Sequence, residues 1–431
     1  MADGEAGNVT GEQVAVIGLG YVGLPLAVAL ARFGDVVGYD IDAVRVAEIK
    51  AGIDRTGEIG PDELNASALT VTADLDACCE ADVFIITVPT PVDGANRPDL
   101  GPLCRAVDAV AGLLAPGKPR TIVLESTVYP GVTEEVCGPR IAELTGLQRG
   151  RDFFLGYSPE RINPGDREHT VGRVIKVIAG ENEAITEQLA ALYGRITTAG
   201  VYRAKSIKVA EAAKVIENAQ RDINIAFMNE ITQIFSRLGL SARDVLDTAG
   251  TKWNFLPFRP GLVGGHCIGV DPYYLSHCAQ SLGHLPRVIL AGRAINDGMG
   301  AWIADQIHER RRSRTGRILC LGVTFKEDVP DLRNSKVLDL AQRLIWLGHD
   351  VVLHDPVAEA VAVEAEFGRP LTADALADRY DVVLAAVPHA SYRALGAETV
   401  AALAKEGGLV ADLHGIWREV ELPRALDRWV L

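Results

Sequence analysis

The sequence lacks paired cysteine motifs, long apolar runs and an excess of basic residues. Its seven cysteines are odd in number and show neither CxxC pairs nor metal-ligand spacing, a pattern typical of reduced thiols. No apolar run is long enough to span a bilayer, and the first thirteen residues lack the charged-then-apolar order of a signal peptide. The formal net charge of −14 argues against broad binding to nucleic acid or anionic membranes. We therefore expect a cytoplasmic protein with no metal, no nucleic-acid partner and no membrane contact.

The length and composition are those of a multidomain globular protein. A chain of 431 residues predicts two or three domains with sizeable cores. Hydrophobic residues make up 48% and charged residues 23%, which fits a soluble fold. An acidic protein of this kind binds an anionic ligand only through a local group of cations and backbone N–H groups.

A glycine-rich turn near the N-terminus indicates a dinucleotide site. An apolar strand beginning at Val14 runs into Gly18-x-Gly20-x-x-Gly23, a helical stretch follows, and a second strand ends on Asp40. The first glycine allows the tight turn, the second admits a pyrophosphate to the helix N-terminus, and the third lets helix and strand pack closely. An acid about 20 residues beyond the motif takes the ribose hydroxyls and repels a 2′-phosphate, which favours NAD over NADP.

Three further positions near this motif are open to two interpretations. Arg45 lies close enough in sequence to serve the adenosine side, or it is a solvated helix residue. Thr90 and Thr127 follow the apolar strands at 83–88 and 121–125, and loops after parallel strands line the ligand crevice. Each threonine is equally a turn hydroxyl that caps its own backbone. A third loop after residues 153–157 carries Glu160 and Arg161.

Residues 201–238 contain neither glycine nor proline and have a helical apolar period. A continuous helix of this kind would be roughly 50 Å long. Lys214, Asn218 and Arg221 recur on it at i, i+4 and i+7, which places them on one face. That face is either a solvated stripe or, because apolar residues occupy much of the circumference, part of a mostly buried helix whose polar groups face a specific partner.

Residues 258–275 combine a thiol with an imidazole and a carboxylate. Cys267 lies next to His266 and four residues before Asp271, among several glycines that permit positive φ angles. A cysteine thiolate in such surroundings is a candidate nucleophile. The alternative is a small buried residue, as most free cysteines are.

The alternation of strands and helices returns in the last third of the chain. Apolar strands begin near residues 317, 351, 380 and 409, which predicts a second doubly wound domain. Gly322 stands there without a GxGxxG motif, so we expect no second dinucleotide. The polar crossover after Phe325 carries Lys326 and Arg333, which either bind an anion or are surface cations. The stretch after Asp412 carries no functional signal.

Taken together, the motifs resemble those of the nucleotide-sugar 6-dehydrogenases, the family that acts on UDP-glucose and UDP-N-acetylhexosamines. The resemblance covers nearly the whole chain and rests on Gly18-Leu-Gly-Tyr-Val-Gly-Leu-Pro25, Val88-Pro-Thr-Pro91, Glu125-Ser-Thr127, Ser158-Pro-Glu-Arg161, Lys214-x-x-Glu-Asn218, Gly264-Gly-His-Cys267-x-x-x-Asp271 and Phe325-Lys-x-Asp328.

The resemblance implies an α/β protein with two Rossmann-like doubly wound domains, joined by a long central helix in an all-helical middle region. We expect an NAD-binding domain at 1–204, a central helical domain with the cysteine loop and the dimer interface at 205–305, and a UDP-binding domain at 306–431. The chain is then expected to form a homodimer or a higher homo-oligomer.

The reaction implied by the resemblance is a four-electron oxidation of the sugar C6 alcohol to a carboxylate with two NAD molecules in turn. Cys267 would add to the C6 aldehyde and carry a thiohemiacetal and then a thioester, which water hydrolyses. The catalytic residues implied are Cys267, Lys214, Asn218, Asp271, Glu160 and Thr127. The division of base work among Lys214, Asp271 and Glu160 stays open.

The resemblance also implies binding roles. The cofactor-binding positions are Gly18, Gly20, Tyr21, Val22, Gly23, Asp40, Arg45, Thr90, Thr127 and Arg333. The substrate-binding positions are Glu160, Arg161, Lys214, Asn218, Arg259, Gly264, Phe325 and Lys326.

The sequence around Cys267 resembles that of the branch of the family that acts on UDP-N-acetylglucosamine or UDP-N-acetylgalactosamine. UDP-glucose and UDP-N-acetylmannosamine remain alternatives, because one pocket residue can admit or reject an acetamido group. A different class of function, a catalytically silent NAD-sensing module, is the other alternative.

Overall fold

The computed structural model describes residues 11–162, 168, 170–265 and 268–431. The chain divides into two compact units. The first comprises Met1–Glu217 and Tyr273–Cys278, and the second comprises Asn218–Pro272 and Ala279–Leu431. Within the described ranges, no helix is both long and apolar enough to cross a membrane.

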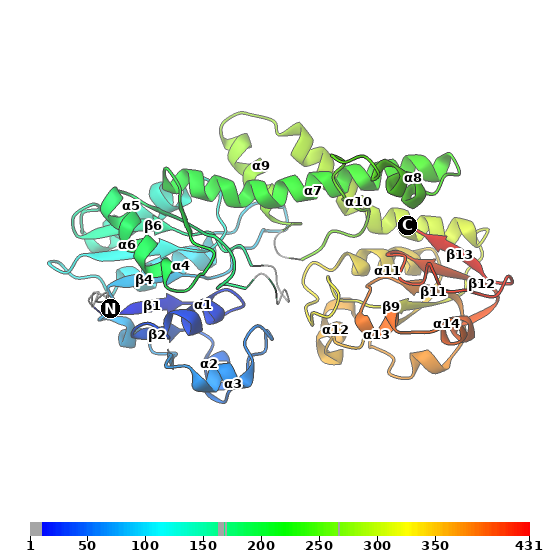
Figure 1. Ribbon diagram of the computed structural model, residues 1–431, viewed down its shortest axis with the longest axis horizontal. Coiled ribbons are helices and arrows are strands. Elements are labelled where there is room, and N and C mark those ends of the chain that lie inside the picture. The colour runs from blue at the N-terminus through cyan, green and yellow to red at the C-terminus, as the bar shows by residue number, and fades with distance from the viewer. Residues whose placement is uncertain (1–10, 163–167, 169, 266–267) are drawn as a thin grey trace, which may run out of the picture. The chain divides into compact units, whose positions relative to one another are not determined.

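The first unit is built on a sheet whose strands follow the order β3-β2-β1-β4-β5-β6-β7-β8 (Figure 1). Neighbouring strands are parallel except for the antiparallel pair β6 and β7. The strands are β1 (Val14–Ile17), β2 (Val36–Tyr39), β3 (Thr70–Thr72), β4 (Val83–Ile86), β5 (Arg120–Leu124), β6 (Phe153–Tyr157), β7 (Lys176–Gly180) and β8 (Val201–Arg203).

Helices pack on both faces of this sheet. They are α1 (Gly23–Leu30), α2 (Ala43–Lys50), α3 (Pro61–Ala66), α4 (Gly101–Ala111), α5 (Gly138–Thr145) and α6 (Glu183–Gly194), with short helical turns η1 (Leu75–Cys78) and η2 (Val132–Cys137). Along β1, Ala15 and Ile17 enter one hydrophobic core and Val14 and Val16 enter the other. Side chains alternate across a strand, so an uninterrupted apolar run is what a strand covered on both faces requires.

The middle of the chain is helical. It comprises α7 (Ile207–Arg237), α8 (Ala242–Ala249), α9 (Asp271–Ser281) and α10 (Arg287–Arg310). The long helix α7 begins in the first unit and ends in the second, and it is unbroken over 31 residues. The absence of glycine and proline from residues 201–238 accounts for its length, since either residue weakens a helix interior.

The second unit contains a parallel sheet in the order β10-β9-β11-β12-β13. Its strands are β9 (Arg317–Leu321), β10 (Asp350–His354), β11 (Tyr380–Ala385), β12 (Ala404–Asp412) and β13 (Asp427–Val430). The helices between them are α11 (Lys336–Trp346), α12 (Ala360–Phe367), α13 (Ala390–Arg393) and α14 (Ala397–Leu403), with a short turn η3 (Ala375–Ala377). Alternate residues of β9 again enter separate cores.

The two sheets share one local device at the end of their first strand. After β1, Gly18 has a φ of +97°, and the N–H of the next residue donates to the carboxylate that follows β2, Asp40, at 2.7 Å. After β9, Gly322 has a φ of +89°, and the N–H of Val323 donates to the carboxylate that follows β10, Asp355, at 2.7 Å. The same turn is therefore built twice from unrelated flanking residues.

The expected fold class is confirmed: two Rossmann-like sheets are joined by a long central helix in a helical middle region. The expected strands are present with ends that differ by a few residues. Sequence reasoning missed β3, β7, β8 and β13, which are strands of three to five residues. Two of these, β3 and β8, are largely exposed or half-buried and have no apolar run to reveal them.

Candidate active site

The glycine turn after β1 leaves no room for a side chain at two of its three glycines. A Cβ at Gly23 would lie 1.9 Å from the carbonyl oxygen of Gly18 and 2.4 Å from Oγ1 of Thr87. A Cβ at Gly18 would touch Val88 in a backbone conformation that disfavours side chains. By contrast, a Cβ at Gly20 would meet no atom within 4 Å. Gly20 thus faces open space, as expected of a residue that a pyrophosphate approaches closely.

Asp40 is fixed beside this turn. Its carboxylate accepts from the N–H of Leu19 at 2.7 Å and from the N–H of Asp42 at 2.9 Å, and the residue is half-buried. Tyr21 and Val22, in the turn before α1, are also half-buried. A left-handed glycine, a helix N-terminus and an accessible carboxylate are the groups that hold a dinucleotide, so the residues present fit NAD.

Arg45 is a buried residue that braces the turn. It is 4% exposed, and its Nε donates to the carbonyl of Leu19 at 2.9 Å while Nη2 pairs with Asp54 at 2.7 Å. The interpretation of Arg45 as a solvated helix residue is therefore wrong. Its direct contact with the cofactor stays a prediction.

The loops after β4 and β5 are tied to each other. Oγ1 of Thr90 donates to the carbonyl of Thr127 at 2.7 Å, and the hydroxyl of Tyr274 donates to the carbonyls of Thr90 and Pro91. Thr90 therefore does not cap its own backbone. Together these bonds hold the two loops at the carboxyl edge of the sheet, where a ligand crevice forms in such folds.

Glu160 lies in the loop after β6 and is 5% exposed. Its Oε1 accepts from the N–H of Arg161 at 2.5 Å and from the N–H of Ile162 at 2.7 Å. The ammonium of Lys214, on α7, donates to the backbone carbonyl of Glu160. Arg161 itself pairs with Glu217 at 2.8 Å. The structure thus brings together Lys214 and Glu160, which the sequence analysis predicted to act at one site.

A buried ion cluster, unforeseen from the sequence, lies behind Glu160. The Nζ of Lys176, on β7, is 3.1 Å from Oε2 of Glu125 and 3.4 Å from Oε2 of Glu160, and the side chain of Lys176 is fully buried. The same ammonium lies 5.2 Å from the ring centroid of Tyr193 on α6. We call Lys176, Glu125 and Glu160 the buried ion cluster.

The pKa values of the three residues in the buried ion cluster are shifted in different ways. Burial raises the pKa of Glu125 above its usual range despite the nearby ammonium. Burial also opposes ionisation of Glu160, but Lys176 and the N–H of Ile162 outweigh it and lower the pKa of Glu160. For Lys176, burial is outweighed by the two carboxylates, which raise its pKa. The cluster therefore keeps Lys176 charged and Glu160 ionised, and Glu125 takes up a proton more readily.

In the second unit, Asn218 and Asp271 are hydrogen-bonded. The Nδ2 of Asn218 donates to Oδ2 of Asp271 at 2.5 Å, and both residues are buried. Arg221, which the sequence analysis placed on the same face of the helix, is exposed. The expectation of a common buried face therefore holds for Lys214 and Asn218 and is wrong for Arg221, which is exposed although i+7 returns to the side of the helix on which i lies.

The segment that leads to the cysteine is anchored at its start. The side-chain amide of Asn229 accepts from the N–H of Gly261 at 2.8 Å and donates to its carbonyl at 3.0 Å. Asn229 is fully buried and also donates to Asn296 at 2.8 Å. Such a two-way amide contact fixes the backbone direction at Gly261. His266 and Cys267 lie outside the described residues.

Gly264 and Gly265 let this segment pack against the crossover after β9. A Cβ at Gly264 would lie 2.5 Å from the carbonyl oxygen of Asn334, and one at Gly265 would lie 2.8 Å from the ring of Phe325. Gly265 also has a φ of +80°. The glycine pair therefore has a steric reason that the sequence alone did not reveal.

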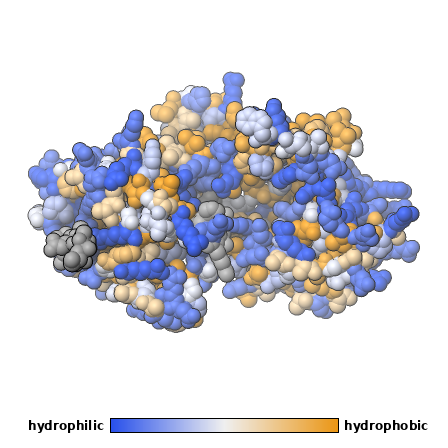
Figure 2. Space-filling view, viewed as in Figure 1, coloured by the Kyte–Doolittle hydropathy of each residue, from blue (hydrophilic) through white to orange (hydrophobic). Residues whose placement is uncertain are grey.

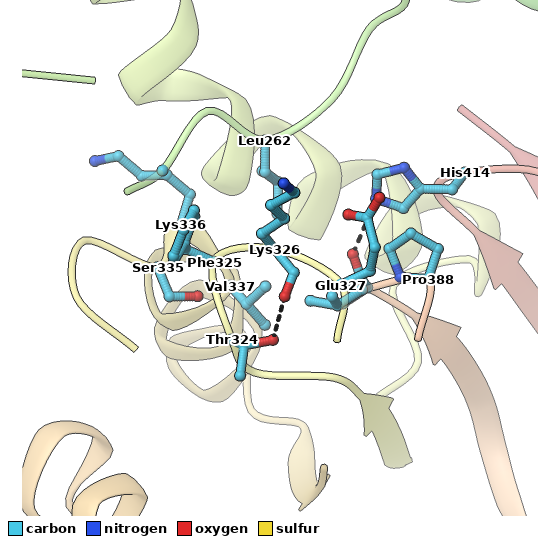
Figure 3. A pocket seen from close by; sticks show the side chains of 13 residues that line it. Leu262, Thr324, Phe325, Lys326, Glu327, Ser335, Lys336, Val337, Pro388 and His414 are labelled. Carbon is cyan, nitrogen blue, oxygen red and sulfur yellow. Dashed lines mark hydrogen bonds between the residues drawn. The ribbon is translucent and has the colours of Figure 1, made fainter. Parts of the chain in front are cut away.

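A pocket opens at this contact (Figure 3). Lys326 extends between a group formed by Phe325 and Lys336 and a group formed by Pro388 and His414. Gly264, Phe325 and Lys326, three residues predicted to bind substrate, line it together. His414 follows Asp412, in a stretch expected to carry no functional signal, so that expectation missed a pocket residue.

The two remaining predicted arginines are engaged with nearby carboxylates. Arg259 pairs with Asp247 at 2.7 Å, and Arg333 pairs with Asp331 at 2.8 Å. Their ligand contacts stay predictions. Over the described part of the chain, no group of three or more His, Cys, Asp or Glu side chains is arranged to hold a metal.

Comparison with known proteins places the chain in a family. Residues 12–197 match the NAD binding domain of the UDP-glucose/GDP-mannose dehydrogenase family, residues 208–298 match its central domain, and residues 319–419 match its UDP binding domain. The chain belongs to the UDP-glucose/GDP-mannose dehydrogenase family. Given its NAD binding domain and its glycine turn, this family member is an NAD-dependent oxidoreductase.

Relatives of this UDP-glucose/GDP-mannose dehydrogenase family member align over almost their full length. A UDP-N-acetyl-D-glucosamine 6-dehydrogenase from Pseudomonas aeruginosa is 49% identical, covering 93% of this chain and 96% of the relative. Another from Salmonella typhi is 44% identical, covering 93% and 95%. The solved structure of a UDP-D-ManNAc dehydrogenase from Pyrococcus horikoshii superposes with a TM-score of 0.85 at 28% identity, covering 96% and 98%.

Proposed function

We propose that this protein oxidises the C6 hydroxyl of a UDP-N-acetylhexosamine, UDP-GlcNAc or UDP-GalNAc, to the corresponding uronic acid. The observation that carries the proposal is the likeness to UDP-N-acetyl-D-glucosamine 6-dehydrogenases over 93% of the chain, joined with a glycine turn that fits NAD. The reaction converts an alcohol, two NAD and one water into a carboxylate, two NADH and three protons. When bound, NAD accepts one hydride in each oxidation.

In the first oxidation, Lys214 and Asn218 hold the oxygen at C6. They are four residues apart on α7, both are buried, and each already has one polar partner that fixes its orientation. An ammonium and an amide N–H at this position stabilise the negative charge that develops on the oxygen as the hydride leaves. Asp271 positions Asn218 through their hydrogen bond.

In the second stage, the thiolate of Cys267 adds to the C6 aldehyde and forms a thiohemiacetal. Loss of a second hydride from that carbon and of the proton from its hydroxyl gives a thioester, which water cleaves with release of the thiolate. Glu160, with Thr127, orients the water and accepts one of its protons. The lowered pKa of Glu160 supports this role, since a base must be ionised before it can take a proton.

Binding roles follow the three parts of the chain, which we propose as an NAD-binding domain at 1–204, a central domain at 205–305 and a UDP-binding domain at 306–431. In the first, the cofactor contacts are the residues of the glycine turn with Asp40, Thr90 and Thr127. In the last, the pocket of Phe325 and Lys326 receives the nucleotide. Arg161 and Arg259 supply further positive charge for the diphosphate, and Arg333 contacts the cofactor.

We further propose that two copies of the chain associate through the central helices, and that the protein works in the cytoplasm. Large apolar side chains on α7 and directly after it are about half exposed or more: Phe227 at 54% and Ile234 at 49% on the helix, and Leu238 at 64% just past its last residue. Figure 2 shows hydrophobic surface near α8. Leu240, just before α8, is 51% exposed, and Trp253, just after it, is 92% exposed. Exposed apolar surface of this extent supports a protein–protein interface.

The deciding experiment measures NADH formed per sugar consumed, with UDP-GlcNAc, UDP-GalNAc, UDP-ManNAc and UDP-glucose in parallel. We expect about two NADH per acetamido sugar, as a four-electron oxidation through a covalent intermediate requires. Two NADH only with UDP-glucose or UDP-ManNAc would keep the chemistry and overturn the substrate. Binding of NAD without turnover of any of the four would leave an NAD-sensing module.

A Cys267→Ser variant tests the covalent stage separately. A hydroxyl is a far weaker nucleophile than a thiolate at neutral pH, so we expect NADH production at saturating substrate to fall by at least about 100-fold. Cys79→Ser, which changes an exposed free thiol, is the matched control. Unchanged turnover in Cys267→Ser would remove the thioester from the reaction.

A further inference from the structure

The buried ion cluster contains more charge than the packing of β7 requires. Lys176 starts a strand whose next residues, Val177 and Ile178, are buried and apolar. An apolar side chain at position 176 would fill the same space, whereas a buried ion pair must overcome the desolvation of both its members. The lysine is nevertheless fully buried between two carboxylates that come from distant loops.

We propose that Lys176 is a positioning residue for thioester hydrolysis. Its ammonium holds the Glu160 carboxylate in place and ionised, and Glu125 is the second carboxylate that pairs with this ammonium. This inference rests on the proposed function, because it assigns Lys176 a role through Glu160. In that step, the water oxygen bonds to the thioester carbon, the C–S bond breaks, one water proton goes to Glu160, and Cys267 leaves as a thiolate.

The contacts of Glu160 define how Lys176 acts. Oε1 of Glu160 is occupied by the N–H groups of Arg161 and Ile162, so Oε2 is the oxygen that faces Lys176. A carboxylate oxygen accepts more than one hydrogen bond, and Oε2 therefore binds the reacting water while Lys176 fixes its direction. Rotation of the carboxylate would break three interactions at once.

The charged and titratable groups that face Glu160 come from four elements. They are Glu125 at the end of β5, Lys176 on β7, Tyr193 on α6 and Lys214 on α7. Glu125 repels Glu160, whereas the two lysines favour its ionised form. Loss of the Lys176 charge removes an opposite charge 3.4 Å from Oε2 of Glu160, which raises the pKa of the Glu160 carboxyl.

The sign of the effect on rate follows from the base role. A higher pKa at Glu160 means a smaller ionised fraction at a given pH, so the acid limb of kcat moves to higher pH. The limb reports the enzyme–substrate complex. Because neither NAD nor sugar binding is assigned to Lys176, KM for both substrates is expected to stay within about twofold.

The experiment compares Lys176→Met, Lys176→Arg and the double variant Lys176→Met/Glu125→Gln in the full-length enzyme. For each, kcat and KM are measured from pH 3.5 to 10, and enzyme-bound uronyl thioester is quantified by intact mass after acid quench. The double variant removes one buried carboxylate together with the cation and so leaves less unpaired buried charge. It tests the role of Lys176 if the single variant is too unstable to purify. Lys118→Met, at an exposed pair with Glu80, is the matched control.

We expect Lys176→Met and the double variant to move the acid limb upward by at least one pH unit and to accumulate thioester. Lys176→Arg is expected to retain most of the wild-type profile, since it keeps the charge. A wild-type limb without accumulated thioester in both methionine variants would overturn the positioning role. Absence of turnover in the wild-type enzyme with every UDP-sugar would instead overturn the proposed function itself.

Discussion

At the residue scale, the glycine turn after β1 separates a structural glycine from a ligand-facing one. Gly23→Ala would place a Cβ 1.9 Å from the carbonyl oxygen of Gly18. The backbone has to shift, and overpacking of this kind typically costs about 1–3 kcal/mol. We expect a lower free energy of unfolding in urea together with weakened NAD binding.

Gly20→Ala is the matched change, because the added methyl group meets no protein atom within 4 Å. We expect its unfolding midpoint to stay at the wild-type value while the Kd for NAD, measured by calorimetry, rises at least about tenfold through a clash with the pyrophosphate. Wild-type NAD affinity in Gly20→Ala would show that the cofactor does not approach this turn.

Residue-scale predictions from sequence succeeded where one local pattern carries the role and failed where partners are remote in the chain. The GxGxxG spacing with Asp40 identified the turn because all its parts lie within 23 residues. Lys176 gave no such signal, since its partners Glu125 and Glu160 are 51 and 16 residues away. Only folding brings these side chains together and buries them.

At the element scale, the second sheet holds its own carboxylate in a closed network. Asp355 accepts from the N–H groups of Val323 and Val357 and from Nε2 of His389 at 3.1 Å. Nδ1 of His389 accepts from the N–H of Asp328, which places the ring proton on Nε2, facing Asp355. The side chains of Asp355 and His389 are both fully buried.

This network predicts an acid-sensitive contribution to stability. Burial opposes ionisation of Asp355, but the bonds from His389, Val323 and Val357 outweigh it and lower the pKa from 3.8 to about 2. A lowered carboxyl pKa gives stability that is present above the unfolded pKa and is lost as pH falls through the folded pKa. The difference corresponds to about 2–3 kcal/mol.

We expect Asp355→Asn to lower the free energy of unfolding at pH 7 by about that amount, with the gap to wild type closing as pH falls from 4 to 2. All five tryptophans lie between residues 253 and 429, so tryptophan fluorescence during urea unfolding reports on the second unit. Glu366→Gln, an exposed residue of α12, is the control. A gap that stays constant with pH would contradict the network's role.

Elements themselves were predicted well when they are buried on both faces. β1, β4, β6 and β9 were expected because continuous apolar runs mark covered parallel strands. The short strands β3 and β8 were not predicted, because strands at exposed or half-buried positions do not need a continuous apolar run. The 31 residues of α7 lie within the stretch 201–238 that was expected to be helical, but residues 201–206 precede the helix and include the strand β8.

At the scale of the whole molecule, the exposed apolar stripe of α7 predicts self-association. Phe227 and Ile234 lie seven residues apart on the part of α7 that belongs to the second unit, and Leu238 follows directly after the helix ends at Arg237. We expect Phe227→Arg/Ile234→Arg to shift the molar mass from at least twice that of one chain to that of one chain. The measurement is light scattering after size-exclusion chromatography.

Val361→Arg, which changes an 82% exposed apolar residue on α12, should leave the assembly intact. A wild-type protein with the mass of a single chain would refute association through these helices. The chain pattern indicated a central helical region from the start, but the outward face of α7 emerged only from burial, because apolar residues occur around most of its circumference.

The closed network around Asp355 also bears on how the proposed reaction uses its cofactor. With that carboxylate sealed by His389, the turn at Gly18 is, among the described residues, the one built to take a dinucleotide. Each sugar nevertheless loses two hydrides. NADH must therefore dissociate and a second NAD must bind while the partly oxidised sugar is still held by Cys267. Complete turnover then depends on the rate of coenzyme exchange relative to the rate at which the aldehyde dissociates. An aldehyde-trapping reagent added to the assay would capture the sugar aldehyde whenever coenzyme exchange is slower than aldehyde dissociation.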